Sequence, residues 1–104
     1  MTSFNKLVRD NIPAIIEASG RKAITRTLHG TELNDALAEK LNEEVAEFQE
    51  SRSIEELADI LEVVRALGEH LGVNIGELEA IREKKAVERG GFSEGVFLVE
   101  TRES

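Results

Sequence analysis

Apolar and polar positions alternate with helical spacing over most of the chain. Three long segments, residues 31–50, 53–71 and 74–89, each carry an apolar stripe of this kind, and we expect a helix in each. A shorter helix is predicted for residues 10–18, with Asp10 as a candidate N-cap and Pro13 in the first turn. Ser53 begins a capping-box pattern, Asn74 is a further candidate cap, and Gly90 is a predicted helix stop.

Two short segments favour extended structure instead. Residues 23–28 (AITRTL) alternate apolar and polar side chains and are rich in Thr, and residues 95–99 (GVFLV) are compatible with a strand that pairs with them. The pattern therefore predicts one mainly α domain spanning residues 1–104, a helical bundle with at most a small two-stranded β accessory. A chain of 104 residues can bury one core without disulfides.

Composition narrows the classes of function. The net charge of −8 argues against duplex nucleic acid as a partner, since phosphate binding needs a basic surface. The absence of cysteine excludes disulfides and thiolate metal ligands. No apolar run approaches the ~20 residues of a membrane span, and the N-terminal residues lack a signal-peptide core, so we expect a protein of the cytosol with no membrane partner.

Several carboxylates fall at positions where apolar side chains are expected. On the helix predicted for residues 31–50, Glu44 lies inside the apolar stripe, and Glu47 lies about 60° to one side of it. On the helix predicted for residues 53–71, Glu56 and Asp59 lie off the solvated arc. The apolar positions of this second helix cover most of its circumference, which is typical of a helix in the middle of a bundle or at a dimer interface.

A buried carboxylate without a partner is costly, so these four acids call for a cation if two helices bring them together. Oxygen ligands without Cys or paired His favour Mg²⁺, or Mn²⁺, over Zn²⁺. Three of these acids also have a simpler explanation. The capping box accounts for Glu56, Glu47 could be a solvated residue of an acidic helix, and Glu44 could reach solvent from the edge of the stripe. Asp59 is the hardest to explain otherwise, because Asp is a poor residue for the interior of a helix.

These acids also carry a resemblance to a known family. Residues 43–47 (EEVAE) and 56–59 (ELAD) resemble the EExxE and ExxD signature of the all-α nucleoside triphosphate pyrophosphohydrolases, which include MazG-like proteins. Residues 5–13 (NKLVRDNIP) are similar to the KLVRDKIP opening of a small MazG-related subgroup, and residues 84–92 (KKAVERGGF) resemble its closing segment. The chain departs from the pattern in the short spacing between Glu47 and Glu56, which requires a tight turn, and in Asn11, where Lys is common.

The resemblance implies hydrolysis of a nucleoside triphosphate between the α- and β-phosphates, giving the monophosphate and pyrophosphate. It implies Mg²⁺ as cofactor, with Glu44 among the metal ligands and Glu43 orienting a ligand or the attacking water. The matched ligand positions are Glu44, Glu47, Glu56 and Asp59. The sequence does not distinguish a common nucleotide, a damaged nucleotide and another pyrophosphate-containing metabolite as the natural substrate.

A triphosphate also needs cations from the protein. Candidates are Lys6, Arg9, Lys40, Lys85 and Arg89, with Lys84 beside them. Lys84 and Lys85 are also explained by the favourable effect of positive charge near the end of a helix, and Arg9 could simply pair with a nearby acid. His29 and His70 are interpreted as structural or surface residues, since no Ser or Cys nucleophile accompanies them.

Two functions from different classes therefore stand. The first is a Mg²⁺-dependent pyrophosphohydrolase, acting as a homodimer or higher homo-oligomer. The second is a non-catalytic acidic helical module that binds a nucleotide or a partner protein. The enzyme requires Glu44, Glu47, Glu56 and Asp59 to converge, whereas the module does not.

Overall fold

The computed structural model describes residues 4–103, and within this range the chain is helical apart from its connections. Its helices are α1 (Ile12–Ala18), α2 (Gly30–Ser51), α3 (Ile54–His70) and α4 (Ile75–Arg89). The mainly α prediction is confirmed, and the bounds of the three long helices agree with the sequence prediction within one residue.

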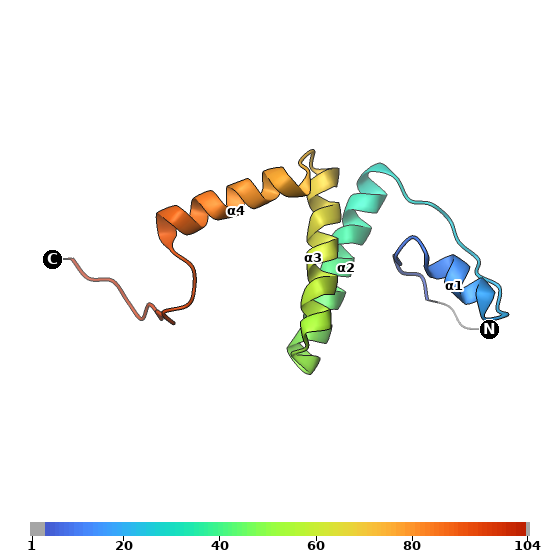
Figure 1. Ribbon diagram of the computed structural model, residues 1–104, viewed down its shortest axis with the longest axis horizontal. Helices are drawn as coiled ribbons and strands as arrows, with labels where there is room; N and C mark the ends of the chain where they lie inside the picture. Colours follow the sequence, from blue (N-terminus) through green and yellow to red (C-terminus); the bar gives the residue numbers. More distant parts are fainter. Residues whose placement is uncertain (1–3, 104) are drawn as a thin grey trace.

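The centre of the molecule is an antiparallel hairpin of α2 and α3 (Figure 1). Arg52 and Ser53 alone connect the two helices, which gives the tight turn that the short spacing required. Arg52 adopts a left-handed conformation with φ +53°, and its backbone N–H donates to the Phe48 carbonyl at 2.8 Å. Such a residue ends a helix abruptly. The turn therefore reverses the direction of the chain within two residues, so that α3 packs along α2.

Side-chain caps fix where α3 and α4 begin. The Ser53 hydroxyl accepts a hydrogen bond from the Glu56 backbone N–H at 3.3 Å. Asn74 and Glu77 form a complete capping box at the start of α4. Gly68 of α3 is buried where α4 packs, and a Cβ there would be in ordinary van der Waals contact with Val73 Cγ2 at 3.4 Å and a methyl carbon of Leu78 at 3.5 Å. These local signals explain why the sequence predicted these boundaries well.

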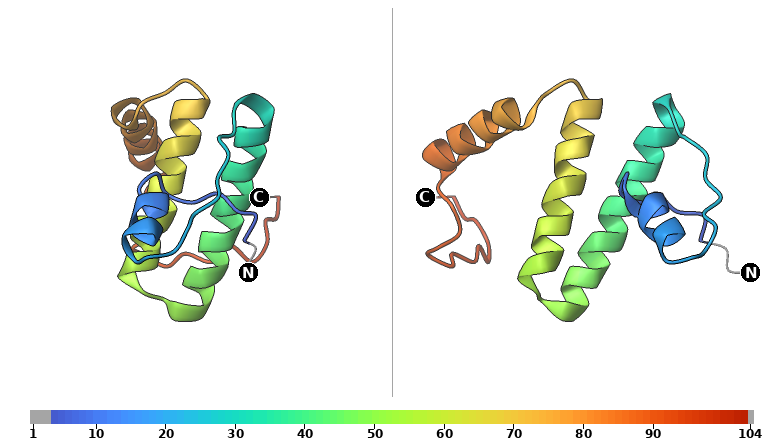
Figure 2. Two further views of the ribbon diagram at one scale, coloured as in Figure 1. Left: turned by 90° about the vertical axis from the view of Figure 1, so that its right-hand side faces the viewer. Right: turned by 45° about the vertical axis from the view of Figure 1, so that its right-hand side comes forward.

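The molecule is elongated and its core is thin. It measures 66 × 31 × 22 Å, with a radius of gyration of 18.4 Å, whereas a compact domain of this size has about 13 Å. Helix α1 lies on one side of the hairpin, and α4 projects from the other (Figures 1 and 2). Of the described hydrophobic residues, only Leu37 and Val63 are buried, and each keeps 7–8% of its surface exposed. Many large apolar side chains are therefore exposed on a single copy.

Two details of the sequence prediction were wrong. Among residues 4–103 no strand is formed, because residues 23–28 and 95–99 lie on opposite sides of the hairpin and strands need a paired backbone (Figure 1). Helix α1 begins at Ile12 rather than at residue 10, so Asp10 is not its cap. Asn11 holds the cap position without a side-chain hydrogen bond.

Nowhere in the described part of the chain does a helix combine the length and the apolar character needed to cross a membrane.

Candidate metal centre

Three carboxylates from the two hairpin helices converge at one point. Glu44 of α2 and Glu56 and Asp59 of α3 each offer an oxygen, and these oxygens all lie within 4.8 Å of one another. Glu44 is buried, with 7% of its surface exposed, and Glu56 and Asp59 are half-buried. The hairpin produces this convergence, because it places the last turns of α2 against the first turns of α3. Three of the four predicted metal ligands therefore meet in space.

The structure distinguishes between the two explanations of Glu56. A full capping box needs its carboxylate to accept from the Ser53 backbone N–H. That N–H instead donates to the Ser51 hydroxyl at 3.3 Å. Only the backbone of Glu56 takes part in the cap. Its side chain is therefore left for the carboxylate cluster.

Two carboxylate oxygens in the cluster lack a partner. Oε2 of Glu44 and Oε2 of Glu56 are buried, and neither accepts a hydrogen bond from any residue in the described range. Burial, reinforced by the neighbouring carboxylates of Glu44 and Glu47, raises the pKa of Glu56 to about 7. Burying a carboxylate oxygen without a hydrogen-bond donor destabilises the folded state. A divalent cation with a preference for oxygen ligands fits this arrangement.

Lys40 supplies positive charge inside the cluster. Its Nζ lies 3.2 Å from an oxygen of Glu43 and 3.3 Å from Oε1 of Glu44, and only 16% of its side chain is exposed. Burial acts to lower the pKa of Lys40, but the contacts with Glu43 and Glu44 outweigh it and raise the pKa. For Glu43, burial is likewise outweighed by Lys40 and Lys6, which hold its pKa below the usual value. Glu43 and Lys40 are thus both charged.

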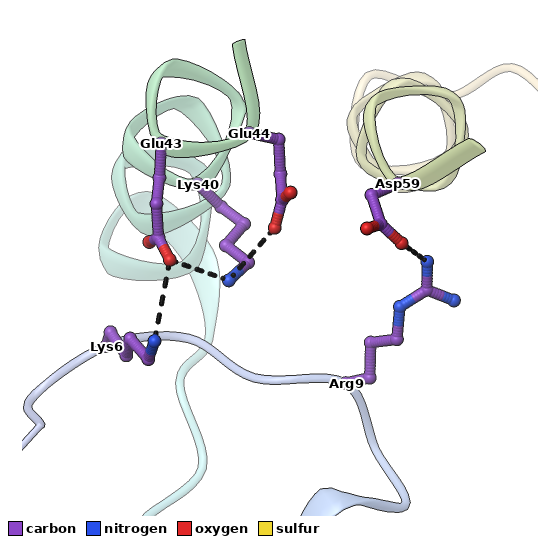
Figure 3. A network of polar contacts seen from close by, with 6 residues as sticks. All are labelled: Lys6, Arg9, Lys40, Glu43, Glu44 and Asp59. Carbon is purple, nitrogen blue, oxygen red and sulfur yellow. Dashed lines mark hydrogen bonds and ion pairs between the residues drawn. The ribbon is translucent and has the colours of Figure 1, made fainter. Parts of the chain in front are cut away.

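The N-terminal segment brings two more cations from the opposite side (Figure 3). Arg9 donates to Asp59 Oδ1 at 2.6 Å, and Lys6 Nζ lies 3.6 Å from an oxygen of Glu43. One cation therefore reaches each hairpin helix, Lys6 toward α2 and Arg9 toward α3. Arg9 does pair with an acid, as one interpretation of the sequence proposed, and that acid is a candidate metal ligand.

The remaining predicted residues lie at the margin or apart. Glu47 is exposed on α2 and influences Glu56 through its charge, but it does not belong to the close cluster. Lys85 and Arg89 are exposed on α4, which projects away from the carboxylates, so one copy of the chain does not bring them to the cluster (Figure 1). His29 and His70 are exposed.

A cleft of about 1000 Å³ adjoins the cluster, between α1 with the segment before it and the α2–α3 hairpin. Its charged part contains Arg9, Lys40, Glu44 and Asp59. Its other part follows α2 back toward Leu33 and α3 forward toward His70, and on α3 the charged residues Glu62, Arg65 and Glu69 line it beside apolar ones. Leu33 and Glu44 are eleven residues apart, which is about 16 Å along a helix. The apolar lining residues include Ile12, Ile15, Leu33, Leu37, Val63 and Ala66.

The sequence pattern did not predict this cleft or the residues that line it. Ile12 and Ile15 carried only the signal of a short amphipathic helix, and nothing in the pattern placed that helix opposite Leu33 and Val63. His70 shares a helix flank with Asp59, which was the single sequence signal that it would face the same space.

Comparison with known proteins identifies no function. No protein-family model matches the chain, and no solved structure matches it. An uncharacterized protein of Mycolicibacterium smegmatis (strain ATCC 700084 / mc(2)155) is 54% identical over 44 residues, which are 42% of this chain and 45% of that protein. The match thus spans less than half of the relative's length.

Proposed function

We propose that this protein is a Mg²⁺-dependent nucleoside triphosphate pyrophosphohydrolase of the cytosol, related to the MazG-like proteins that its sequence resembles. The observation that carries the proposal is the meeting of Glu44, Glu56 and Asp59, with two buried oxygens that lack a partner in the described chain. This donor set fits Mg²⁺ or Mn²⁺.

The carboxylates would hold the metal, with Glu47 at the exposed margin of the same site. When bound, the metal would screen the triphosphate and lower the pKa of a water molecule. Glu43 suits orientation better than proton transfer, because two lysines hold its pKa below the usual value. In the reaction, a water oxygen bonds to the α-phosphorus while the bond from that phosphorus to the bridging oxygen breaks. The water gives up a proton to the solvent, and the electron pair of the broken bond leaves with pyrophosphate.

The cations and the cleft support a phosphorylated substrate. Lys40 and Arg9 line the charged part of the cleft beside Glu44 and Asp59, and Lys6 lies next to them. The other part of the cleft, with apolar residues on α1 and α2 and mixed residues on α3, extends from the carboxylates over about 16 Å of helix. It offers space for the organic part of a nucleotide whose phosphates lie at the cluster.

The proposal includes a homodimer. Helix α3 exposes a row of large apolar residues on the part of its surface that the described chain does not cover. Ile54 is 81% exposed, Leu57 49% and Leu61 60%. A second copy would remove this surface from water, which stabilises an association roughly in proportion to the apolar area buried.

The direct test is release of monophosphate and pyrophosphate from a panel of common and modified nucleoside triphosphates with Mg²⁺. Asp59→Asn is expected to lower turnover by about 100-fold or more, since even indirect partners of a metal ligand affect activity by about 10–100-fold. Glu55→Gln, an exposed acid on the same helix, is the matched control and is expected to leave turnover unchanged.

Metal binding has a separate readout. Mg²⁺ is expected to raise the Tm of the wild-type protein and of Glu55→Gln, because a ligand of the native state stabilises it by mass action. The shift should be much smaller for Asp59→Asn. Absence of turnover on every nucleotide, together with a Tm that Mg²⁺ does not change, would contradict the proposal.

One observation favours the second candidate, a non-catalytic acidic module. Lys40 and Arg9 already contact Glu44 and Asp59, so the chain itself supplies part of the neutralising charge. If the cluster is only structural, Asp59→Asn should alter neither nucleotide turnover nor the response of Tm to Mg²⁺.

A further inference from the structure

Two segments of the described chain are extended and lack backbone partners. Residues 22–28 and 96–103 form no backbone hydrogen bond with any residue between 4 and 103. Neither segment contains proline, so each backbone N–H in them can donate to a neighbouring strand. Both therefore present complete edges of the kind that pair with another chain.

The second segment is also strongly apolar. A turn in which the Gly95 N–H donates to the Phe92 carbonyl at 3.1 Å precedes four consecutive apolar residues. Val96 is 87% exposed, Phe97 86%, Leu98 75% and Val99 83%. Successive residues of a strand point to opposite faces, so a run of this kind suits a strand covered on both sides. We refer to residues 95–99 as the tail strand.

The fold separates the two segments within one copy. Residues 22–28 connect α1 to α2 on one side of the hairpin, and the tail strand follows α4 on the other (Figures 1 and 2). Both extended segments with free backbone edges are therefore present in the chain, but the direction of α4 keeps them apart.

We propose that the tail strand of one copy pairs with residues 23–28 of a second copy, and that the exchange is reciprocal. The partner is a second copy because the chain itself carries both extended segments with free backbone edges, and one copy keeps the two apart. Exchange of identical elements is a common route to a symmetric dimer. Addition of a strand to a free edge supplies main-chain hydrogen bonds for the association.

The apolar area is adequate for such a dimer. Phe92 is 99% exposed and Phe97 86%, and a phenylalanine buries about 150–250 Å² when covered. Two copies together contribute four such side chains, Phe92 and Phe97 from each, which bury roughly 600–1000 Å² in addition to the area of the valines and leucine. A stable interface of standard size buries about 1,600 Å² in total.

The exchange also adds cations near the carboxylate cluster, a consequence that rests on the proposed function. Arg89 precedes Gly95 by six residues, a span of at most about 22 Å of extended chain. Residues 23–28 do not themselves line the cleft, but they belong to the segment that connects two residues that do, Ile15 and Leu33. The second copy would thus bring its Lys85 and Arg89 toward the phosphates. Within a single copy these two residues do not reach the cluster.

The chain has no native cysteine, so the pairing can be tested with introduced ones. A copy with Thr25→Cys is mixed with a copy with Phe97→Cys, refolded together, and treated with a short bismaleimide linker. We expect the mixed product to exceed, several-fold, that formed when Glu83→Cys on exposed α4 replaces Phe97→Cys. Equal yields from the two mixtures, or a monomer in sedimentation at micromolar concentration, would overturn the proposal.

A double variant, Thr25→Cys with Phe97→Cys in one chain, distinguishes exchange from internal pairing. Exchange gives covalent dimers, whereas pairing within one copy gives a linked monomer and contradicts the proposal. Phe97→Glu adds a second measurement, because its side chain is exposed in one copy and its replacement should leave the protomer folded. We expect this variant to form a weaker dimer, with a higher dissociation constant, without losing helical circular dichroism, and a dimer of unchanged stability would contradict the exchange.

None of these measurements uses turnover. A dimer linked through the tail that hydrolyses no nucleotide would contradict the proposed function while the exchange stands. An active protein whose tail does not link between copies would contradict the exchange alone.

Discussion

At the scale of single residues, the acidic cluster depends on a local imbalance of charge. Glu44 lies where a core residue is expected, and Lys40 lies one turn before it, with Nζ 3.3 Å from one carboxylate oxygen. The other oxygen of Glu44 and one oxygen of Glu56 have no donor within residues 4–103. The cluster is thus neutralised only in part by the chain, and a bound cation would complete it.

The raised pKa of Glu56 should make the stability of the protein depend on pH. Its pKa in the folded protein is about 7, against an ordinary value of 4.5. The native state therefore binds this proton more tightly than the unfolded state between these two values. Stability falls with rising pH wherever the native state binds more protons. We expect the contribution of Glu56 to stability to be lost progressively from pH 4.5 to pH 7 in metal-free protein.

The measurement is urea unfolding of wild type and Glu56→Gln across that interval, with a chelator present. Gln mimics the protonated acid, so the difference in unfolding free energy should move in favour of the variant as pH rises. Glu55→Gln is the control for a solvated acid on the same helix. If both variants follow the wild-type pH dependence in parallel, Glu56 does not have a raised pKa.

At the scale of elements, the two-residue turn between α2 and α3 assembles the cluster. Arg52 ends α2, and Ser53 begins α3, so the register of the hairpin depends on these two residues. Ser53 also holds the backbone of Glu56, while the carboxylate of that residue faces Glu44. The cap is therefore a structural support of the candidate site.

Two cap variants separate this support from general stability. Ser53→Ala and Asn74→Ala should each lower the unfolding free energy by about 1 kcal/mol, the usual effect of losing a helix N-cap. Only Ser53→Ala should also weaken Mg²⁺ binding, because Asn74 caps α4 and lies outside the cluster. Calorimetric titration with Mg²⁺ checks this, and equal metal affinities in the two variants would contradict the role given to Ser53.

At the scale of the whole molecule, a single copy leaves much apolar surface in water. Its radius of gyration is 18.4 Å, compared with about 13 Å for a compact domain of this length. Exposed apolar patches of this extent mark surfaces that bind another protein. The hairpin brings the carboxylates together, but α4 and the tail strand find no cover within the described chain.

This exposure predicts that stability depends on protein concentration. If copies associate through α3, the Tm should rise with concentration, because association stabilises the native state by mass action. Leu61→Ser should weaken this dependence, since Leu61 is 60% exposed on one copy. Glu55→Ser is the control on the solvated side. A Tm that is independent of concentration in the wild type would contradict association through this face.

The sequence alone determined the features that depend on near neighbours along the chain. Helix bounds followed from apolar spacing, from the caps Ser53 and Asn74 and from Gly90, because these signals act within one or two turns. The short spacing between Glu47 and Glu56 likewise required a tight turn. Helical periodicity also placed Glu44 in the apolar stripe of its helix, and Glu56 and Asp59 off the solvated arc of theirs.

Only the tertiary structure decided how distant parts of the chain meet. It brought Arg9 to Asp59, left Glu47 at the margin, and used only the backbone of Glu56 in the cap. It also set α1 opposite the hairpin to form the cleft, and it kept residues 23–28 apart from the tail strand. Such contacts depend on the direction of each helix in space, and the periodicity of a segment does not specify that direction.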